Sequence, residues 1–253
     1  MDQHVHERTG SINITRLSEP AGAEVLGIDL SLELGTKQRD ILFEALLKHH
    51  VLVIRDQDLT PDQQMALTAK FGKPESHVFH DAKGKSGPQV HVVNNLDKQG
   101  NPSSRPTTFG SFFWHTDKSY HEVPSLATFL HARELPPGGG GDTEFANMYN
   151  AYESLGDELK KQIAGLRAVH SWEANRRNTG NRPATEEEKK LRPPVSHPLV
   201  RTHPDTKRKT LYIGIHADCI EGLERKQGTI AEHLLLAEGN ILKAWFEQSR
   251  ISE

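Results

Sequence analysis

The triplet His115-Thr116-Asp117 is the part of this sequence whose residue types and spacing point most directly to chemistry. Side chains two residues apart on an extended strand point to the same face, so the imidazole and the carboxylate can reach one ion together. One His and one Asp are two-thirds of the facial triad that holds Fe(II) in non-haem oxygenases and leaves positions open for O2 and a co-substrate. The spacing therefore predicts a metal site at a strand end, which still needs a second histidine from far downstream.

A His-x-Asp triplet is a weak signal by itself, because about one match is expected by chance in a chain with this many histidines. The pair at His203 contains a proline and precedes a basic run, which is typical of a turn. The pair at His216 ends an expected strand, and His216 is either an inward-facing core residue or a contact to a metal or substrate. The first pair follows the aromatic residues 112–114 (FFW), which could wall a dry site. The alternative for it is a hydrogen-bonded His-Asp pair without a metal.

The composition excludes several classes of function. The chain has 253 residues, a formal net charge of -3, 35% hydrophobic residues and a single cysteine, Cys219. It holds no apolar run of membrane-spanning length, no secretory signal, no basic stripe for nucleic acid and no partner for a disulfide. We therefore expect one domain or at most two, in the cytoplasm, with neither nucleic acid nor membrane as a partner. A homo-oligomer is compatible with this composition.

The hydrophobic pattern predicts short strands, Gly/Pro-rich turns and helices mainly in the first third of the chain. Expected helices are 36–50, 60–71, 149–155, 157–166 and 228–247. Expected strands are 23–30, 51–54, 90–94, 126–134, 143–148, 195–201 and 210–216, the last two forming a hairpin, with long loops over 76–113 and 176–192. This order favours a mainly β protein with flanking helices (α+β), a sandwich or jelly roll, over alternating β-α-β units.

Several ordered motifs together resemble the TauD/TfdA family of Fe(II)/α-ketoglutarate-dependent dioxygenases. They are residues 22–30, 50–57 (HVLVIRDQ), 114–120 (WHTDKSY), 134–143 (ELPPGGGGDT), 165–170 (GLRAVH) and 197–203 (HPLVRTH). The similarity runs from about residue 12 to about residue 225, and residues 212–217 look closer to the aryloxyacetate branch than to the sulfonate branch. The resemblance implies one domain over 1–253 with a double-stranded β-helix, the jelly roll, and a metal near its mouth.

The resemblance also implies roles for individual residues. His115 and Asp117 would be iron ligands, and Thr143 would hydrogen-bond a carboxylate of the co-substrate α-ketoglutarate. His77 matches a histidine that contacts the substrate's anionic group in the taurine enzyme, and His80 takes the place of a nearby tyrosine. His216 is a further candidate for substrate contact.

One departure from the family is large. The sequence lacks a Trp-Asp-Asn-Arg-x-x-x-His motif, which would supply the third iron ligand, and the arginine that follows it to bind α-ketoglutarate. His233 is expected on a helix and is an ordinary helix residue. The tail 226–253 does not look like the family, so we expect a jelly roll that is incomplete at its C-terminal end, in a truncated chain.

Three functions compete on these residues. The first is an Fe(II)- and α-ketoglutarate-dependent dioxygenase that uses O2 to hydroxylate a small anionic substrate of the sulfonate or aryloxy/carboxylic acid type, releasing succinate and CO2. The second is a non-catalytic jelly-roll remnant that binds metal or small molecules weakly. The third is a zinc hydrolase using His115, Asp117 and His216, since catalytic zinc sites also need three protein ligands.

Overall fold

The computed structural model describes residues 11–75, 90–97, 99–101, 113–135 and 138–222. The chain forms two compact units, the first from Met1–His91 and Phe129–Asn147 and the second from Val92–Thr128 and onward from Met148. No helix in the described part of the chain is both long and apolar enough to cross a membrane. The predicted helix 228–247, including His233, lies outside the described residues.

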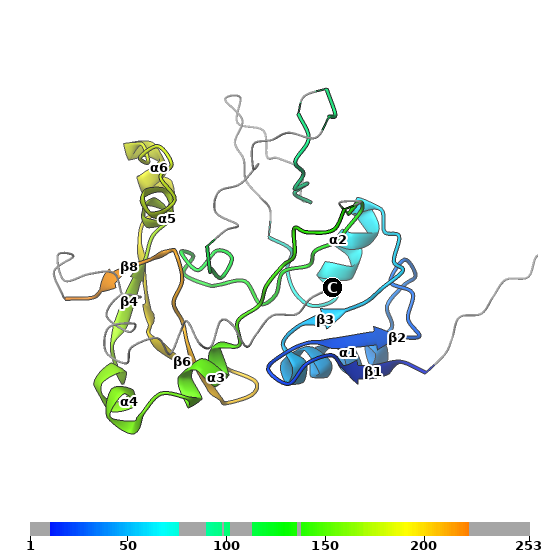
Figure 1. Ribbon diagram of the computed structural model, residues 1–253, viewed down its shortest axis with the longest axis horizontal. Helices are drawn as coiled ribbons and strands as arrows, with labels where there is room; N and C mark the ends of the chain where they lie inside the picture. Colours follow the sequence, from blue (N-terminus) through cyan, green and yellow to red (C-terminus); the bar gives the residue numbers. More distant parts are fainter. Residues whose placement is uncertain (1–10, 76–89, 98, 102–112, 136–137, 223–253) are drawn as a thin grey trace, which may run out of the picture. The chain divides into compact units, whose positions relative to one another are not determined.

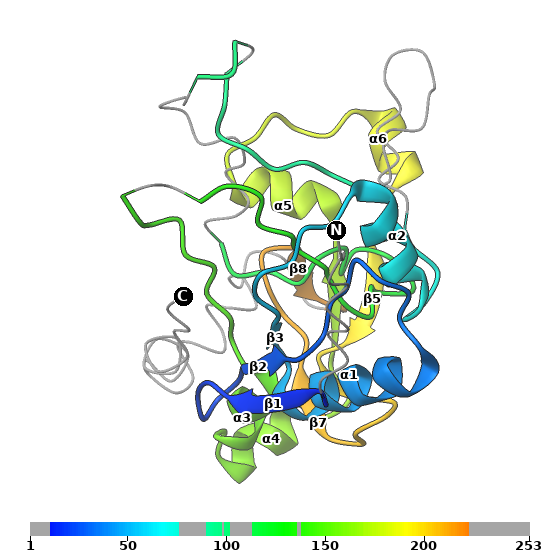
Figure 2. The same ribbon diagram turned by 90° about the vertical axis from the view of Figure 1, so that its right-hand side faces the viewer.

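The described residues of the first unit form a small sheet and two helices (Figure 1). Its strand order is β1 (Asn13–Arg16), β2 (Ala23–Leu26) and β3 (Leu52–Val53), with β1 antiparallel and β3 parallel to β2. Helix α1 (Thr36–His49) connects β2 to β3 and lies beside the sheet, as Figure 2 also shows. The core contains Val25, Leu42 and Leu67.

Helix α2 (Pro61–Ala69) begins where the sequence predicts it. The Thr60 hydroxyl accepts a hydrogen bond from the Gln63 backbone N–H, and the Gln63 side chain accepts one from the Thr60 N–H. This reciprocal arrangement satisfies two N–H groups that a helix start leaves open, and Pro61 at the first helical position lacks the N–H that would otherwise need a partner.

From Met148 onward the second unit continues with two short helices, α3 (Met148–Glu153) and α4 (Asp157–Ile163), both predicted. Strand β4 (Arg167–His170) is central in an antiparallel sheet of order β5-β4-β8, with β5 (Val195–Pro198) and β8 (Ala217–Ile220) at its edges. Strands β6 (Val200–Thr202) and β7 (Lys209–Leu211) form the predicted hairpin around the basic turn. The core of this unit gathers Leu155, Ile163, Ala168, Leu199 and Leu211.

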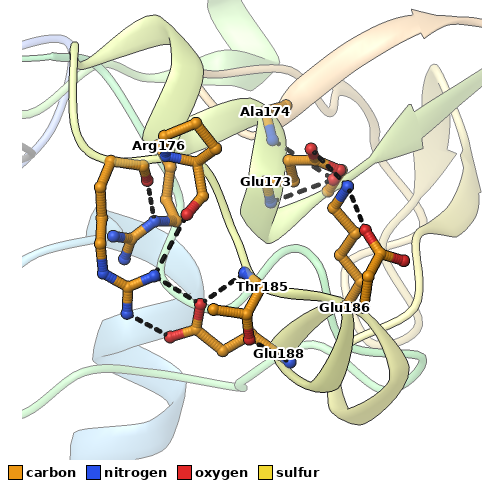
Figure 3. Close-up of polar contacts among 10 residues, drawn as sticks. Glu173, Ala174, Arg176, Thr185, Glu186 and Glu188 are labelled. Atoms are coloured by element: carbon orange, nitrogen blue, oxygen red, sulfur yellow. Dashed lines mark hydrogen bonds and ion pairs between the residues drawn. The ribbon is translucent and has the colours of Figure 1, made fainter.

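The prediction of a loop over 176–192 is wrong. Helix α5 (Trp172–Asn178) begins after Ser171, whose hydroxyl accepts from the N–H groups of Glu173 and Ala174. Helix α6 (Glu186–Leu191) begins with a capping box between Thr185 and Glu188. Figure 3 shows these contacts. Lys189 of α6 forms an ion pair with Glu173, which links the two helices, and a second one with Glu186 in its own helix. Capping and charge pairs form helices here without an apolar stripe, so helices are not confined to the first third of the chain.

Several predicted strands are also absent. No strand forms over residues 90–94, 126–134, 143–147 or 212–216. The segment 114–116, which contains His115, is not a strand either. Phe129 packs on Phe71 in the core of the first unit, with ring centroids 5.5 Å apart. Other apolar residues of these segments, namely Val92, Val93, Leu126 and Leu130, are exposed. The described chain is therefore more evenly mixed between helix and strand than predicted.

Candidate functional site

His115 and Asp117 lie close together, as their spacing predicts. Nε2 of His115 is 3.4 Å from Oδ1 of Asp117. Two ligands that each bind one ion at about 2.0–2.2 Å are separated by a distance of this order. His115 is in extended backbone and Asp117 begins a turn, so the pair forms without the strand that was predicted.

The remaining polar atom of each side chain is held by the protein. Nδ1 of His115 lies 2.7 Å from the carbonyl oxygen of Phe113. A carbonyl can only accept, so Nδ1 carries a proton. In the neutral ring the Nε2 lone pair is then left for an ion, and in the charged ring Nε2 donates to Asp117. Oδ2 of Asp117 accepts a hydrogen bond of 2.9 Å from the Thr128 hydroxyl, which leaves Oδ1 available. Metal-binding histidines and carboxylates are oriented by such outer partners in the same way.

The charges of the pair also suit a cation. The hydrogen bond from His115, followed by the one from Thr128, lowers the pKa of Asp117 to about 2, so the carboxylate is ionised at neutral pH. The same hydrogen bond to Asp117 raises the pKa of His115, against the effect of burial. A proton and a metal ion therefore compete for the Nε2 position, and metal binding would release the proton.

A neighbouring segment supports the backbone of the pair. The Ile215 N–H donates a 3.0 Å hydrogen bond to the carbonyl oxygen of Trp114. At Gly214, a Cβ atom would lie 3.1 Å from the His115 Cα and 3.2 Å from the Trp114 oxygen. Any larger residue would require these backbone atoms to move by a few tenths of an ångström.

His216 lies next to the pair and is buried. Its ring centroid is 6.3 Å from that of His115 and 4.9 Å from that of Tyr120. Its Nε2 is 3.3 Å from the Asn175 amide nitrogen, while its Nδ1 has no hydrogen-bond partner among the described residues. Burial, and then the charge of His115, lower the pKa of His216 to about 4, so the ring is neutral at neutral pH.

The other two His-x-Asp triplets do not form comparable pairs. His203 accepts hydrogen bonds from the backbone N–H groups of Asp205 and Thr206, which is the predicted turn. Asp218 forms an ion pair with Arg177. Within the described residues no group of three His, Cys, Asp or Glu side chains could hold a metal ion, so His115 and Asp117 fit a metal as two ligands only. His216 does not complete a zinc site with them.

The remaining predicted residues lie elsewhere. Thr143 is exposed in the first unit, after the glycines Gly139, Gly140 and Gly141, which all have positive φ. That it shares a pocket with His115 stays a prediction. His77 and His80 lie outside the described residues. Sequence reasoning missed Thr128, because nothing in the sequence links a hydroxyl to a carboxylate eleven positions away.

Comparison with known proteins identifies the family. The family described as taurine catabolism dioxygenase TauD, TfdA family matches residues 13–235 of this chain. The chain belongs to the TauD/TfdA family. The match extends about ten residues beyond the predicted end of the resemblance, into the tail that was expected to be atypical.

Individual TauD/TfdA proteins support this assignment. The α-ketoglutarate-dependent 2,4-dichlorophenoxyacetate dioxygenase of Cupriavidus pinatubonensis is 34% identical over 224 residues, which cover 85% of this chain and 76% of that enzyme. The α-ketoglutarate-dependent sulfonate dioxygenase of Saccharomyces cerevisiae is 31% identical over 215 residues, 82% of this chain and 50% of that enzyme. The crystal structure of AAD-2 in complex with Mn(II) and N-oxalylglycine superposes with a TM-score of 0.69 at 33% identity, over 90% of this chain and 79% of that one. The predictions of family, of a dioxygenase and of dependence on a metal and α-ketoglutarate are thus confirmed at family level.

Proposed function

We propose that this protein is an Fe(II)- and α-ketoglutarate-dependent dioxygenase that hydroxylates a small anionic organic substrate. The reaction would convert α-ketoglutarate and O2 to succinate and CO2, with the second oxygen atom entering a C–H bond of the substrate. The observation that carries the proposal is the arrangement of His115 and Asp117. Their two free ligand atoms face each other at 3.4 Å while their other polar atoms are occupied by protein groups.

His115 would bind the metal through Nε2 and Asp117 through Oδ1. When bound, Fe(II) supplies the activation of O2 and the co-substrate, a chemistry that no side chain of this chain performs. The protein's part is orientation: the Phe113 carbonyl fixes the imidazole tautomer, and the Thr128 hydroxyl fixes the carboxylate. The Thr128 hydrogen bond also keeps Asp117 in the ionised form that a metal needs.

The anionic ligands would be held by residues outside this pair. We propose that Thr143 binds an α-ketoglutarate carboxylate and that His77, His80 and His216 contact the substrate. For His216, the support is a buried Nδ1 beside the pair that has no partner within the described residues. The dichlorophenoxyacetate and sulfonate relatives support a substrate class of aryloxy or carboxylic acids or sulfonates. The fold would be a jelly roll in one domain, and a cytoplasmic location stays a prediction.

A second candidate is a protein that binds metal or small molecules weakly and has no turnover. It is favoured by one observation: the described residues place two candidate ligands together and no third. Two ligands hold a divalent ion less strongly than three, so this candidate predicts a weak metal complex and no succinate.

Anaerobic addition of Fe(II) and α-ketoglutarate, followed by O2, separates the candidates. A dioxygenase gives the visible charge-transfer band of the chelate and then succinate in several turnovers per chain. His115→Ala and Asp117→Asn should abolish the band, whereas the matched control His203→Ala, in a triplet that forms only a turn, should preserve it. A band without succinate would favour the second candidate, and an unchanged band in Asp117→Asn would refute the metal site.

A further inference from the structure

We propose that His170 and His197 are positioning residues that hold the turn carrying Asp117, without contacting metal or substrate. The inference rests on the proposed metal site. It concerns the second unit only, where both histidines lie on adjacent strands and their polar atoms contact the residues that follow Asp117.

The two histidines are neighbours because of the strand register. In the antiparallel pair β4–β5, His197 lies opposite Ala168 and His170 lies opposite Val195, so the two side chains are two positions apart on the same face of the sheet. Their rings meet edge to face with centroids 5.3 Å apart. His170 is 1% exposed and His197 is 6% exposed.

Both histidines contact the turn, and His197 hydrogen-bonds the backbone of Ser119 as well as that of His121. Nδ1 of His170 lies 3.1 Å from the Ser119 hydroxyl, which is itself buried. Nε2 of His197 lies 3.0 Å from the backbone carbonyl of His121, so it is the N–H donor. The turn is therefore held two and four residues after Asp117. Both histidines are themselves fixed in place, because backbone hydrogen bonds set the register of β4 and β5.

The turn combines local backbone hydrogen bonds with one residue in an unfavourable backbone conformation. The Ser119 N–H reaches the Thr116 carbonyl at 3.4 Å, and the His121 N–H reaches the Lys118 carbonyl at 2.9 Å. Lys118 has φ 52°, a left-handed conformation that is unfavourable for a residue with a side chain. Such conformations persist when surrounding contacts determine them, and the two histidines provide those contacts.

The surroundings explain why these positions are histidines. Tyr212 stacks on His170 with centroids 5.1 Å apart and meets His197 edge-on at 5.4 Å, and the Arg201 guanidinium covers the tyrosine ring at 4.5 Å. A histidine ring fills this aromatic layer and still offers a polar atom to the turn. Burial and the neighbouring His197 and His216 lower the pKa of His170 to about 4, so the ring stays neutral in the core.

Paired substitutions test the positioning role. His170→Phe and His197→Phe keep an aromatic ring but remove the polar contact, whereas His170→Asn keeps a polar atom near Nδ1 and His197→Gln keeps a donor near Nε2. Co(II) affinity of the full chain, measured by its visible absorption, should fall about 10- to 100-fold in the Phe variants and recover to within about threefold of wild type in the polar ones. Hydrogen exchange should rise in peptides spanning 116–121 and stay unchanged in α2.

Ser119→Ala gives the same test without changing either histidine. It should weaken Co(II) binding as His170→Phe does, and the double variant should bind no more weakly than either single variant, because one contact cannot be lost twice. The inference is overturned if the Phe variants and Ser119→Ala bind Co(II) with wild-type affinity. It is also overturned if the Phe and polar variants lose Co(II) affinity equally. If the wild-type chain binds no Co(II), the metal-site proposal fails, and unchanged exchange at 116–121 would then overturn the positioning role by itself.

Discussion

The substitution Gly214→Ala should move His115 without touching its side chain. The new Cβ would lie 3.1 Å from the His115 Cα and 3.2 Å from the Trp114 carbonyl oxygen. Ordinary contacts between such atoms begin near 3.4 Å, so the backbone must separate by about 0.3 Å. Side-chain rotation cannot relieve this contact, and the Ile215–Trp114 hydrogen bond of 3.0 Å resists the separation.

The expected cost divides between metal binding and stability. A shift of a few tenths of an ångström misaligns Nε2 of His115 with Oδ1 of Asp117 but does not remove either ligand. Changes to residues that support a metal ligand typically weaken metal binding about 10- to 100-fold. We expect the lower end of this range here, so Co(II) should bind about tenfold more weakly, which corresponds to ~1.4 kcal/mol. The free energy of unfolding should fall by about 1 kcal/mol, the lower end for overpacking.

Calorimetric titration with Co(II) and thermal unfolding measure these two effects. Gly72→Ala is the matched control, since a Cβ there meets nothing within 4 Å and the residue lies in the other unit. It should leave Co(II) affinity unchanged. The reasoning is refuted if Gly214→Ala binds Co(II) as tightly as wild type while it remains folded, because the segment would then tolerate displacement without affecting the pair.

Three further perturbations follow from the described contacts. Thr128→Val, which keeps the shape but removes the hydroxyl from Asp117, should weaken Co(II) binding about 10-fold or more and raise the pKa of Asp117; unchanged affinity would show that this contact does not orient the carboxylate. Burial lowers the pKa of His170 to about 4, so the unfolded state binds more protons than the folded state between about pH 6.5 and 4. The contribution of this residue to the free energy of unfolding is therefore full above this window. It falls by up to about 1.4 kcal/mol per pH unit as the pH drops through the window. Denaturant unfolding at several pH values checks this, and a slope that stays the same in His170→Phe would contradict the assignment. Thr185→Ala should destabilise α6 by about 1 kcal/mol and increase hydrogen exchange over 186–191, whereas Thr185→Ser, which can still cap, should not.

Local chemistry explains where the sequence predicted structure correctly. The capping box of Thr60 and Gln63 identified the start of α2 because both partners are three residues apart in the chain. The same signal at Thr185 and Glu188 identifies α6, and it was overlooked because the surrounding residues are polar and charged. Signals that lie within one turn of a helix are therefore readable from sequence even where no apolar face is present.

The candidate site was predictable only in part. The proximity of His115 and Asp117 follows from their spacing, although extended backbone and a turn produce it instead of a strand. The contacts of His170 and His197 depend on chain pairing over long separations, such as the 76 positions between His121 and His197. No local pattern encodes these contacts, since they exist only once the β4–β5 register is set.

That register has a consequence for how the chain can change in length. Strand β4 has a register shift relative to β8 between Val169 and His170, so one edge of the sheet already accommodates an irregularity next to the buried histidine. A one-residue insertion or deletion inside β4 or β5 would turn His170 or His197 to the opposite face of the sheet. The connection between these strands, which contains α5 and α6, carries no such constraint on either ring. Length variation should accordingly concentrate in that connection and avoid the two strands.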